Sequence, residues 1–227
     1  MRRMFMLLLI VCLLPISASG SEQPKYVALT FDDGPSGRYT RRLLEGLRER
    51  EAKATFFLCG YRLEAGGDLA GVILEEGHEI GLHGYSHDNM KAMTRRQIAG
   101  ELERTGKLLP PSASPVWLRP TGGCCSDGVR QVAGAMGISL LGWSVDPRDW
   151  AIRDAAAIGR SVTEQIRDGD VVLLHDMTDS SVDAALQIID RLRERGFRFV
   201  TVSELARRRG IDPVPGRLYS SFPPENG

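Results

Sequence analysis

"YVALTFDDGP", residues 26–35, carries two adjacent aspartates at the end of an apolar run and closes with Gly-Pro. An apolar run bounded by turn residues is typical of a buried β-strand. Successive strand side chains point to opposite faces, so Asp32 and Asp33 can reach one site only if the chain leaves strand geometry there. We expect the following Gly34 and Pro35 to supply that break.

Two carboxylates held side by side repel each other unless a cation lies between them or hydrogen bonds hold one of them. The aspartate pair therefore indicates a metal site. A plain surface turn is the alternative, because Asp, Gly and Pro all favour turns.

Composition bounds the size and the partners of the protein. The chain has 227 residues, 42% of them hydrophobic, which suits one domain of roughly 200 residues with a sizeable core. Basic and acidic residues number 29 each, so no excess of positive charge points to nucleic acid. We expect a neutral partner instead.

The first twenty residues predict an export signal. Arg2 and Arg3 precede an unbroken apolar run over residues 4–14, and small residues follow up to Gly20. The run is shorter than the roughly 20 residues of an ordinary membrane-spanning helix, although an uncleaved membrane anchor is the alternative. We therefore expect a signal peptide at 1–20 and a secreted or cell-wall-associated protein.

Seven short apolar runs predict strands, and longer charged segments between them predict helices. The predicted strands begin at residues 26, 54, 78, 116, 138, 171 and 197. The predicted helices cover 40–50, 69–76, 94–109, 127–136, 154–167, 181–195 and 203–209. This alternation predicts a mainly parallel sheet with helices outside and with functional residues at the carboxyl ends of the strands. One domain is expected at 21–210, and the tail, 211–227, is expected to pack little.

Three cysteines follow the predicted signal: Cys59, Cys124 and Cys125. Because adjacent cysteines bridge each other only with strain, a disulfide would join Cys59 to one of the pair. Three thiols packed as small hydrophobic groups are the alternative. We expect Cys59, which follows a predicted strand, to be at least partly buried.

The segment "HGYSH" places His83 and His87 four residues apart after another predicted strand. In an extended chain they would lie about 13 Å apart, whereas in a helical turn they share one face and can chelate. Two histidines and one carboxylate suit a divalent transition metal with open coordination positions. The second aspartate would then be free to act as a base. We expect the preceding His78 to be structural.

Further polar groups follow other predicted strands, in "WLRPTGG", "WSVDPRDW" and "VVLLHD". Together with "TFDDGP" and "HGYSH", and in the same order along residues 25–205, these motifs resemble the polysaccharide deacetylases with a NodB homology domain, carbohydrate esterase family 4. The resemblance implies a distorted (β/α) barrel of seven or eight mainly parallel strands. It also implies metal-dependent removal of N-acetyl groups from a sugar polymer.

The resemblance assigns the metal site and the base. It implies that Asp33, His83 and His87 bind a divalent metal, usually Zn²⁺. Asp32 would be the general base that takes a proton from water. Arg119 would hold Asp32 by a charge-assisted hydrogen bond.

The remaining roles concern the acid and the substrate. His175 would protonate the departing amine, and Asp146 would orient its imidazole. Gly122 would offer a backbone N–H to the oxyanion, while Trp150 and Leu173 would line the pocket for the acetyl methyl group.

Two positions depart from the family pattern. Gly84 stands where most members have Ser or Thr. The arginine motif commonly continues Pro-Tyr-Gly, whereas here it is Thr121-Gly122-Gly123; neither change removes a proposed ligand, base or acid. The expected function is an exported N-deacetylase of peptidoglycan or a chitin-like oligosaccharide. The alternatives are an O-acetyl esterase of a xylan-type polymer and an inactive glycan-binding relative.

Overall fold

The computed structural model describes residues 24–224, so the predicted signal at 1–20 lies outside the described residues. The described chain contains eight strands. Their bounds are β1 (Lys25–Gly34), β2 (Ala54–Leu58), β3 (Glu79–Leu82), β4 (Trp117–Leu118), β5 (Ser139–Leu141), β6 (Val171–His175), β7 (Phe197–Phe199) and β8 (Leu218–Tyr219).

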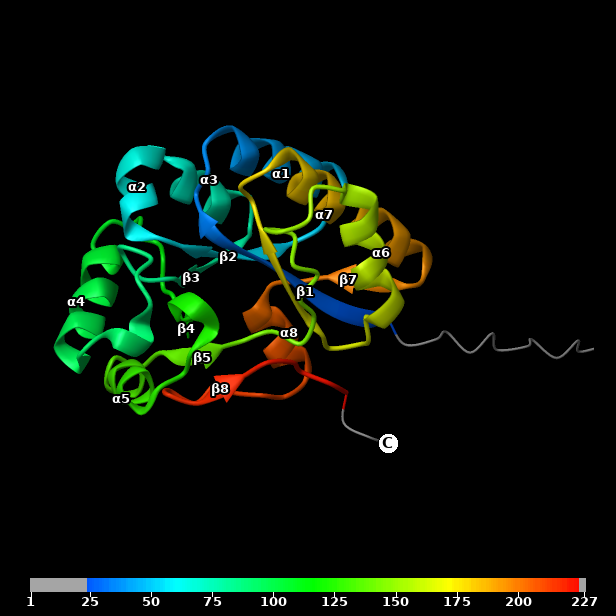
Figure 1. Cartoon of the computed structure of the whole chain (residues 1–227). Coiled ribbons are helices and arrows are strands. Elements are labelled where there is room, and N and C mark those ends of the chain that lie inside the picture. Colours follow the sequence, from blue (N-terminus) through cyan, green and yellow to red (C-terminus); the bar gives the residue numbers. More distant parts are fainter. Residues whose placement is uncertain (1–23, 225–227) are drawn as a thin grey trace, which may run out of the picture.

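These strands form one curled sheet in the order β6-β1-β2-β3-β4-β5-β8, with β7 beside the first residues of β1 (Figure 1). Every pairing between them is parallel. After β5, Val145 forms a parallel bridge to Val172 of β6, which brings the two sides of the sheet together. The predicted α/β fold, a distorted barrel of seven or eight mainly parallel strands, is confirmed.

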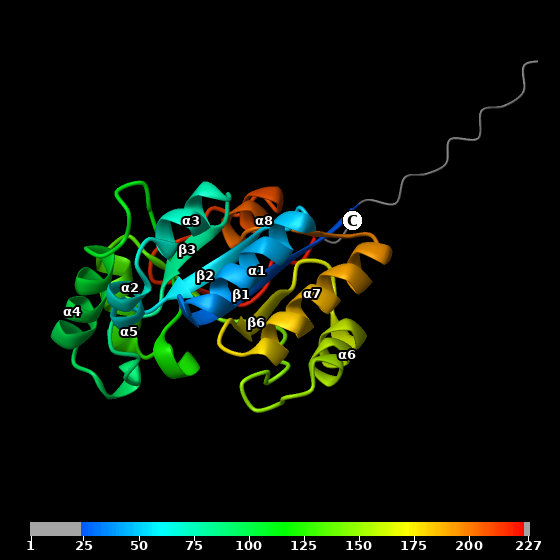
Figure 2. The same cartoon turned by 90° about the horizontal axis from the view of Figure 1, so that it is seen from above.

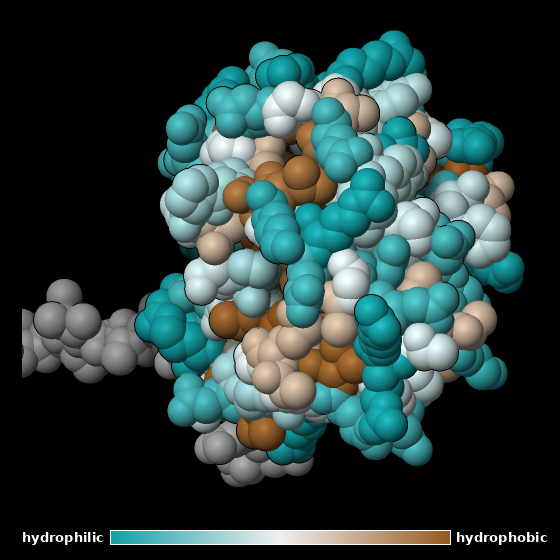
Figure 3. Space-filling view, turned by 90° about the vertical axis from the view of Figure 1, so that its left-hand side faces the viewer, coloured by the Kyte–Doolittle hydropathy of each residue, from teal (hydrophilic) through white to brown (hydrophobic). Residues whose placement is uncertain are grey.

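Helices cover the outside of the sheet, as Figures 1 and 2 show. Their bounds are α1 (Arg38–Glu49), α2 (Gly60–Gly66), α3 (Leu69–Glu75), α4 (Arg95–Gly106), α5 (Asp127–Ala135), α6 (Ala155–Gln165), α7 (Asp179–Glu194) and α8 (Val202–Arg208), with short 3₁₀ turns η1 (Met90–Ala92) and η2 (Thr121–Gly123). Hydrophilic side chains cover most of the face drawn in Figure 3, and hydrophobic residues reach it in separate small clusters. No helix within residues 24–224 has the length and apolar character needed to cross a bilayer.

The helices from α4 to α8 start where the sequence offers a side-chain cap. Thr94 accepts a hydrogen bond from Gln97 N and forms a full capping box with it at α4. The side chains of Asp154, Thr178 and Thr201 accept hydrogen bonds from backbone N–H groups at the starts of α6, α7 and α8. Short polar residues at these positions therefore fix where the strand ends give way to helices.

Strand β1 is buried on both faces, which explains its nearly continuous apolar sequence. Leu29 and Phe31 pack outward into the main core with α1 and α7. The alternate residues Ala28, Thr30 and Asp32 are also buried. Because side chains alternate along a strand, this second set points into the barrel, where two of its members are polar.

His78 has the structural role predicted for it. Its side chain is buried, and its Nδ1 accepts a hydrogen bond from the backbone N–H of Ala54 at 3.2 Å. Burial, with the nearby charge of Lys53, lowers the pKa of His78 to about 4. The imidazole is therefore neutral at ordinary pH and accepts the strand's free N–H.

The three described cysteines are free thiols, so the disulfide alternative is not realised in the structure. Cys59 is fully buried after β2, as expected. Burial, followed by the charges of Asp33 and Asp32, raises the pKa of its thiol well above the usual range. Cys59 therefore packs as an inert small group.

The prediction that the tail packs little is wrong. Strand β8 pairs with β5, and Tyr219 and Phe222 close one end of the barrel around Trp117. The ring centroids of Tyr219 and Phe222 lie 5.7 and 5.9 Å from that of Trp117. The Phe222 N–H also donates to Gly169 O at 2.7 Å. The prolines of this segment favoured a loosely packed tail in the prediction. The surface on which the tail packs exists only in the folded barrel.

We expect Phe222→Ala to lower the free energy of unfolding by about 3 to 5 kcal/mol, because the fully buried ring leaves a cavity beside Trp117. Urea unfolding followed by tryptophan fluorescence measures the change. Val214→Ala is the matched control on the same tail, since Val214 is 50% exposed and should change stability by less than about 0.5 kcal/mol. Equal effects of the two variants would contradict the packing role of the tail.

Candidate active site

The candidate site lies at the carboxyl ends of β6, β1, β3 and β4, with β2 between β1 and β3 in the sheet. Asp32 of β1 is the register partner of His175 of β6. On the other side, Leu82 of β3 pairs with Leu118 of β4, so the residues that follow them, His83 and Arg119, lie side by side. Parallel strands thus collect side chains that are far apart in the sequence.

The chain leaves strand geometry at Asp33 itself, and the prediction that Gly34 and Pro35 supply the break is wrong. Asp33 has a φ of 68°, a left-handed conformation that Asp tolerates better than most residues. The register with β2 shifts between Asp32 and Gly34, which still pairs with Leu58. This bulge allows both carboxylates to face the same end of the barrel.

The next residue, Gly34, is a glycine because there is no room for a side chain there, and not because of its backbone conformation. A Cβ added at Gly34 would lie 2.9 Å from Asp176 Oδ1. Asp176 is fully buried, and Thr40 donates a hydrogen bond to its Oδ2. Burial raises the pKa of Asp176 to about 7. The motif therefore needs Gly here so that a buried carboxyl group can pack behind Asp33.

His83 and His87 approach each other through a loop, and the alternative of a helical turn is wrong. Gly84 and His87 have φ of 83° and 65°, and the two imidazole centroids are 5.4 Å apart. A Cβ at Gly84 would also lie 2.8 Å from Met90 Cε. Glycine therefore suits this loop, where Ser or Thr would be strained.

Glu101 of α4 holds the loop in place, and sequence reasoning missed it. Its Oε2 accepts hydrogen bonds from Tyr85 N at 2.8 Å, Ser86 N at 2.7 Å and Ser86 Oγ at 3.0 Å. A helix carboxylate with three donors fixes the loop between the two histidines. In the sequence, Glu101 is one of several charged residues of α4. Nothing in the sequence pattern distinguishes it from the acidic residues that face solvent.

The three side chains expected to bind a metal, those of Asp33, His83 and His87, lie together, and one possible donor atom from each is within 4.8 Å of the others. Asp33 Oδ1 lies 2.8 Å from His87 Nε2 and 3.3 Å from His83 Nε2, yet it is buried and receives no hydrogen bond of good geometry. His83 Nδ1 lies 2.6 Å from the carbonyl oxygen of Arg119 and donates its proton there. Its Nε2 lone pair therefore faces the carboxylate, an arrangement that fits a divalent cation between them.

The same contacts decide which group carries charge. Burial raises the pKa of Asp33, but the close contacts and charges of His83 and His87 outweigh it and hold that pKa well below its usual range. The contact with Asp33 raises the pKa of His87 despite its partial burial. Asp33 is therefore anionic across the ordinary pH range.

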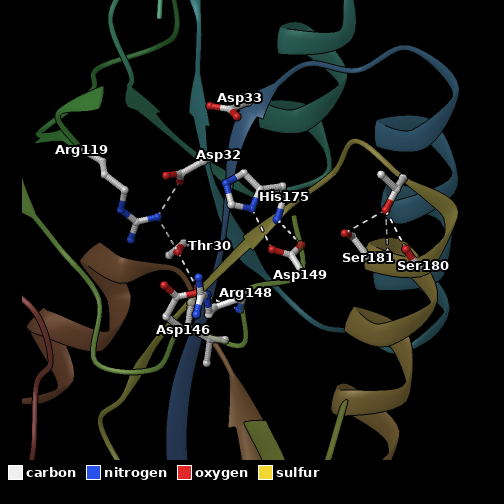
Figure 4. A network of polar contacts seen from close by, with 12 residues as sticks. Thr30, Asp32, Asp33, Arg119, Asp146, Arg148, Asp149, His175, Ser180 and Ser181 are labelled. Carbon is white, nitrogen blue, oxygen red and sulfur yellow. Dashed lines mark hydrogen bonds and ion pairs between the residues drawn. The ribbon is translucent and has the colours of Figure 1, made fainter. Parts of the chain in front are cut away.

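Arg119 holds Asp32, in agreement with the predicted contact (Figure 4). Its guanidinium is fully buried, and Nη1 donates to Asp32 Oδ1 at 2.6 Å and to Thr30 Oγ1 at 2.8 Å. Nη2 donates to Gly142 O at 2.8 Å. Asp32 Oδ2 stays free of these contacts and lies 3.7 Å from His83 Nε2. One carboxylate oxygen is thus anchored while the other faces the ligand set.

The prediction that Asp146 orients His175 is wrong, because Asp149 occupies that position (Figure 4). His175 Nδ1–H donates to Asp149 Oδ1 at 2.8 Å, and the His175 backbone N–H donates to Asp149 Oδ2 at 2.8 Å. Asp149 is fully buried, whereas Asp146 Oδ1 accepts from Arg148 N at 2.8 Å. Arg148 has a φ of 56°, which turns the chain so that the second aspartate of "DPRD" points inward.

Asp149 also sets the charge of His175. Burial lowers the pKa of His175, but the hydrogen bond and charge of Asp149, with the charges of Asp32 and Asp33, raise it to about 9. His175 therefore carries a proton that it can donate at neutral pH.

A cleft of about 480 Å³ collects these groups. All the predicted site residues line it except Arg119, which lies beneath Asp32. Gly122 lines the cleft with a φ of 72°, and its N–H makes no hydrogen bond within residues 24–224. Trp150 and Leu173 supply apolar walls. Gly122, Asp32 and His175 therefore line one space beside Asp33, His83 and His87.

The family model of polysaccharide deacetylases matches residues 19–141, more than half of the chain. The chain belongs to the polysaccharide deacetylase family. This deacetylase is 38% identical to a peptidoglycan-N-acetylglucosamine deacetylase of Bacillus cereus over 81% of this chain and 89% of that protein. It is 33% identical over 85% of its length to a peptidoglycan-N-acetylglucosamine deacetylase of Listeria monocytogenes, of which it spans 42%.

A solved structure of similar shape extends the comparison. The family 4 acetyl xylan esterase of Clostridium thermocellum, solved in complex with a cobalt ion, has a TM-score of 0.79 and 32% identity, covering 88% of this chain and 100% of that chain. The resemblance to carbohydrate esterase family 4 is therefore confirmed, and with it an enzyme of the polysaccharide deacetylase class.

Proposed function

We propose that this deacetylase is an exported, divalent-metal-dependent hydrolase that removes N-acetyl groups from peptidoglycan or a chitin-like glycan. The observation that carries the proposal is the placement of an anchored base, Asp32, and a protonated imidazole, His175, in one cleft with Asp33, His83 and His87. The B. cereus and L. monocytogenes relatives, both named for N-acetylglucosamine in peptidoglycan, support the substrate class.

The ligand set would hold the cation through one carboxylate oxygen and two imidazole nitrogens. A divalent cation bound there, Zn²⁺ by preference of the donor set, supplies positive charge that acidifies water and polarises the acetyl carbonyl. Asp32 takes a proton from water through its free Oδ2 as the water oxygen attacks the acetyl carbon. Arg119 keeps the other oxygen fixed, so the base stays aimed at the same point.

The second half of the reaction needs a proton on the sugar nitrogen. His175 Nε2 donates it as the carbon–nitrogen bond breaks, which releases acetate and leaves a free amine. Asp149 holds the opposite ring nitrogen and so fixes the imidazole orientation. The Gly122 N–H can donate to the developing oxyanion, and Leu173 and Trp150 bound the space for the acetyl methyl group.

Acetate release from a panel of glycans tests the proposal. The metal-loaded protein is expected to release acetate from N-acetylglucosamine oligomers and peptidoglycan strands faster than from O-acetylated xylan. Chelation should stop release, and added Zn²⁺ should restore it. Absence of release from every N-acetylated glycan by protein that retains its metal would overturn the proposal.

An O-acetyl esterase is the second candidate, because the acetyl xylan esterase of C. thermocellum shares the fold over nearly all of its length. With the same base and ligand set, water would attack the ester carbonyl, and the alkoxide leaves more readily than an unprotonated amide nitrogen would. Faster release from O-acetylated xylan would favour this reading. An inactive glycan-binding relative is disfavoured, since Asp32, His175 and the whole ligand set are retained.

Asp149→Asn is expected to lower turnover by roughly 100-fold and to move the alkaline limb of the rate–pH profile to lower pH. Asp149 raises the pKa of His175, so its loss lowers that pKa and the imidazole gives up its proton earlier as pH rises. Measuring kcat between pH 6 and 10 checks both effects. Asp146→Asn is the matched control from the same loop and should leave the limb in place; equal shifts in the two variants would contradict the assignment.

We propose export from the sequence of residues 1–20 alone, with Arg2 and Arg3 before the apolar run. Protein secreted by a bacterial host is expected to begin close to Ser21 when its N-terminus is sequenced. Recovery of intact Met1 in the membrane fraction would instead indicate an anchored enzyme.

A further inference from the structure

The catalytic cleft continues past His175 into two adjoining hollows. The first, of about 320 Å³, shares Asp33, Trp150 and His175 with the cleft. The second, of about 450 Å³, is lined by α1 and α2 and shares Met177 with the first. Figure 4 shows the start of α7, with Ser181, on this side of the site. We call the two hollows together the arginine arm, for the side chains described next.

The charge of the lining side chains changes from negative in the cleft to positive in the arginine arm. Three aspartates line the cleft around the ligand set. The arm is lined by Arg153 in its first hollow and by Arg41 and Arg62 in its second. Apart from Asp33, which the cation would neutralise, no acidic side chain lines the arm within the described chain. A substrate that runs from the cleft into the arm therefore passes from an acidic to a basic environment.

These arginines have no acidic partner of their own. Arg38 and Arg42, on the same helix as Arg41, form ion pairs with Asp179 of α7. Arg41 of α1, Arg62 of α2 and Arg153 of the loop before α6 form no ion pair within residues 24–224. Arg41 and Arg62 line one hollow and Arg153 lines the adjoining one, and Arg62 donates a hydrogen bond to the neutral hydroxyl of Tyr61. Guanidinium groups placed along one path without a protein carboxylate are suited to a carboxylate from a ligand.

Carrying the proposed function further, we propose that the arginine arm binds a carboxylate of the glycan, so that acidic N-acetylated glycans are the preferred substrate class. Trp150 is 54% exposed and lies where the cleft meets the arm, so it offers an aromatic face to a sugar ring. A sugar placed there with its acetyl group at the ligand set extends its neighbours into the arm.

Two sources in peptidoglycan carry such a carboxylate. The lactyl group of a muramic acid residue is a free acid where no peptide is attached. Where a peptide is attached, that acid becomes an amide, and acidic peptide residues provide the charge instead. Both present the same chemistry to Arg41, Arg62 and Arg153, and the substrates of the test separate them.

The test compares kcat/KM for acetate release on three substrates: neutral N-acetylglucosamine oligomers, peptide-free peptidoglycan strands and peptide-bearing strands. Wild type is expected to prefer at least one acidic substrate over the neutral oligomer, and less so at high salt because the attraction is screened. Arg153→Gln and Arg41→Gln should each lower the acidic-to-neutral ratio by about tenfold. Arg42→Gln, which lies outside the arm and is paired with protein acids, should keep the wild-type ratio.

The outcomes separate the two proposals. The carboxylate site in the arginine arm would be contradicted if wild type released acetate without preferring an acidic glycan, or if the arginine variants kept the wild-type acidic-to-neutral ratio of kcat/KM. Either result would leave the proposed deacetylase activity standing. Preference for peptide-free strands identifies the lactyl acid, and preference for peptide-bearing strands identifies the peptide acids. Affinity of Asp32→Asn for the same substrates, measured by calorimetry, tests the arm without turnover: equal affinity for neutral and acidic strands contradicts it even if no acetate is released.

Discussion

Asp33→Ala and Asp33→Asn are both expected to lose the bound metal ion and to lower acetate release by roughly 1,000-fold or more. Asp33 is the one anion of the ligand set, and both histidine Nε2 atoms converge on its Oδ1. A metal that stabilises the transition state by several kcal/mol accounts for a rate loss of this size. Asn tolerates the left-handed φ of 68° at this position, so its effect reports the lost charge rather than backbone strain.

Metal content by mass spectrometry and initial rates on the same preparations check this expectation. Asp146→Asn removes a carboxylate from the same cleft but outside the ligand set, so it should keep the metal. If Asp33→Asn bound metal as tightly as wild type and turned over normally, the proposed ligand set would be wrong.

Asp32→Asn should fail differently, with metal retained and turnover lower by roughly 100-fold or more, the usual contribution of a general base. An Asn side chain can still accept the hydrogen bond from Arg119 Nη1, so the shape of the site is kept. Its amide cannot take a proton from water. The proposed division of labour between the two neighbouring aspartates rests on this contrast.

A stability measurement must accompany this variant, because Arg119 is fully buried and loses the charge of its partner. Unfolding of Asp32→Asn in urea at the assay temperature shows whether the protein is folded during the assay. A folded, metal-bound Asp32→Asn with near-normal turnover would rule out Asp32 as the base.

Local sequence signals were sufficient for most of the framework. Apolar runs located the strands from β1 to β7, and capping residues such as Thr94 and Thr178 mark the helix starts that the structure adopts. One α-helix and one strand escaped prediction. Helix α2 begins and ends with glycine and has no side-chain cap, and β8 has only two residues. The pairing of β8 with β5 depends on a surface that exists only once the barrel has formed.

The errors at the site share one physical origin, which is backbone conformation that no periodic pattern reveals. Left-handed φ values at Asp33, His87 and Arg148 decide where the neighbouring side chains point. At Arg148 this turn places Asp149, in place of the expected Asp146, against His175. The residue types were correct in each case, but their directions depended on the folded loop.

Titration of chelated protein with Zn²⁺ tests the central claim most directly. Acetate release should be absent from the metal-free protein, rise in proportion to added Zn²⁺ and level off at one ion per chain, as one set of Asp33, His83 and His87 requires. Full activity after chelation to a metal content near zero, or activity that continues to rise well beyond one ion per chain, would contradict the proposed catalytic site.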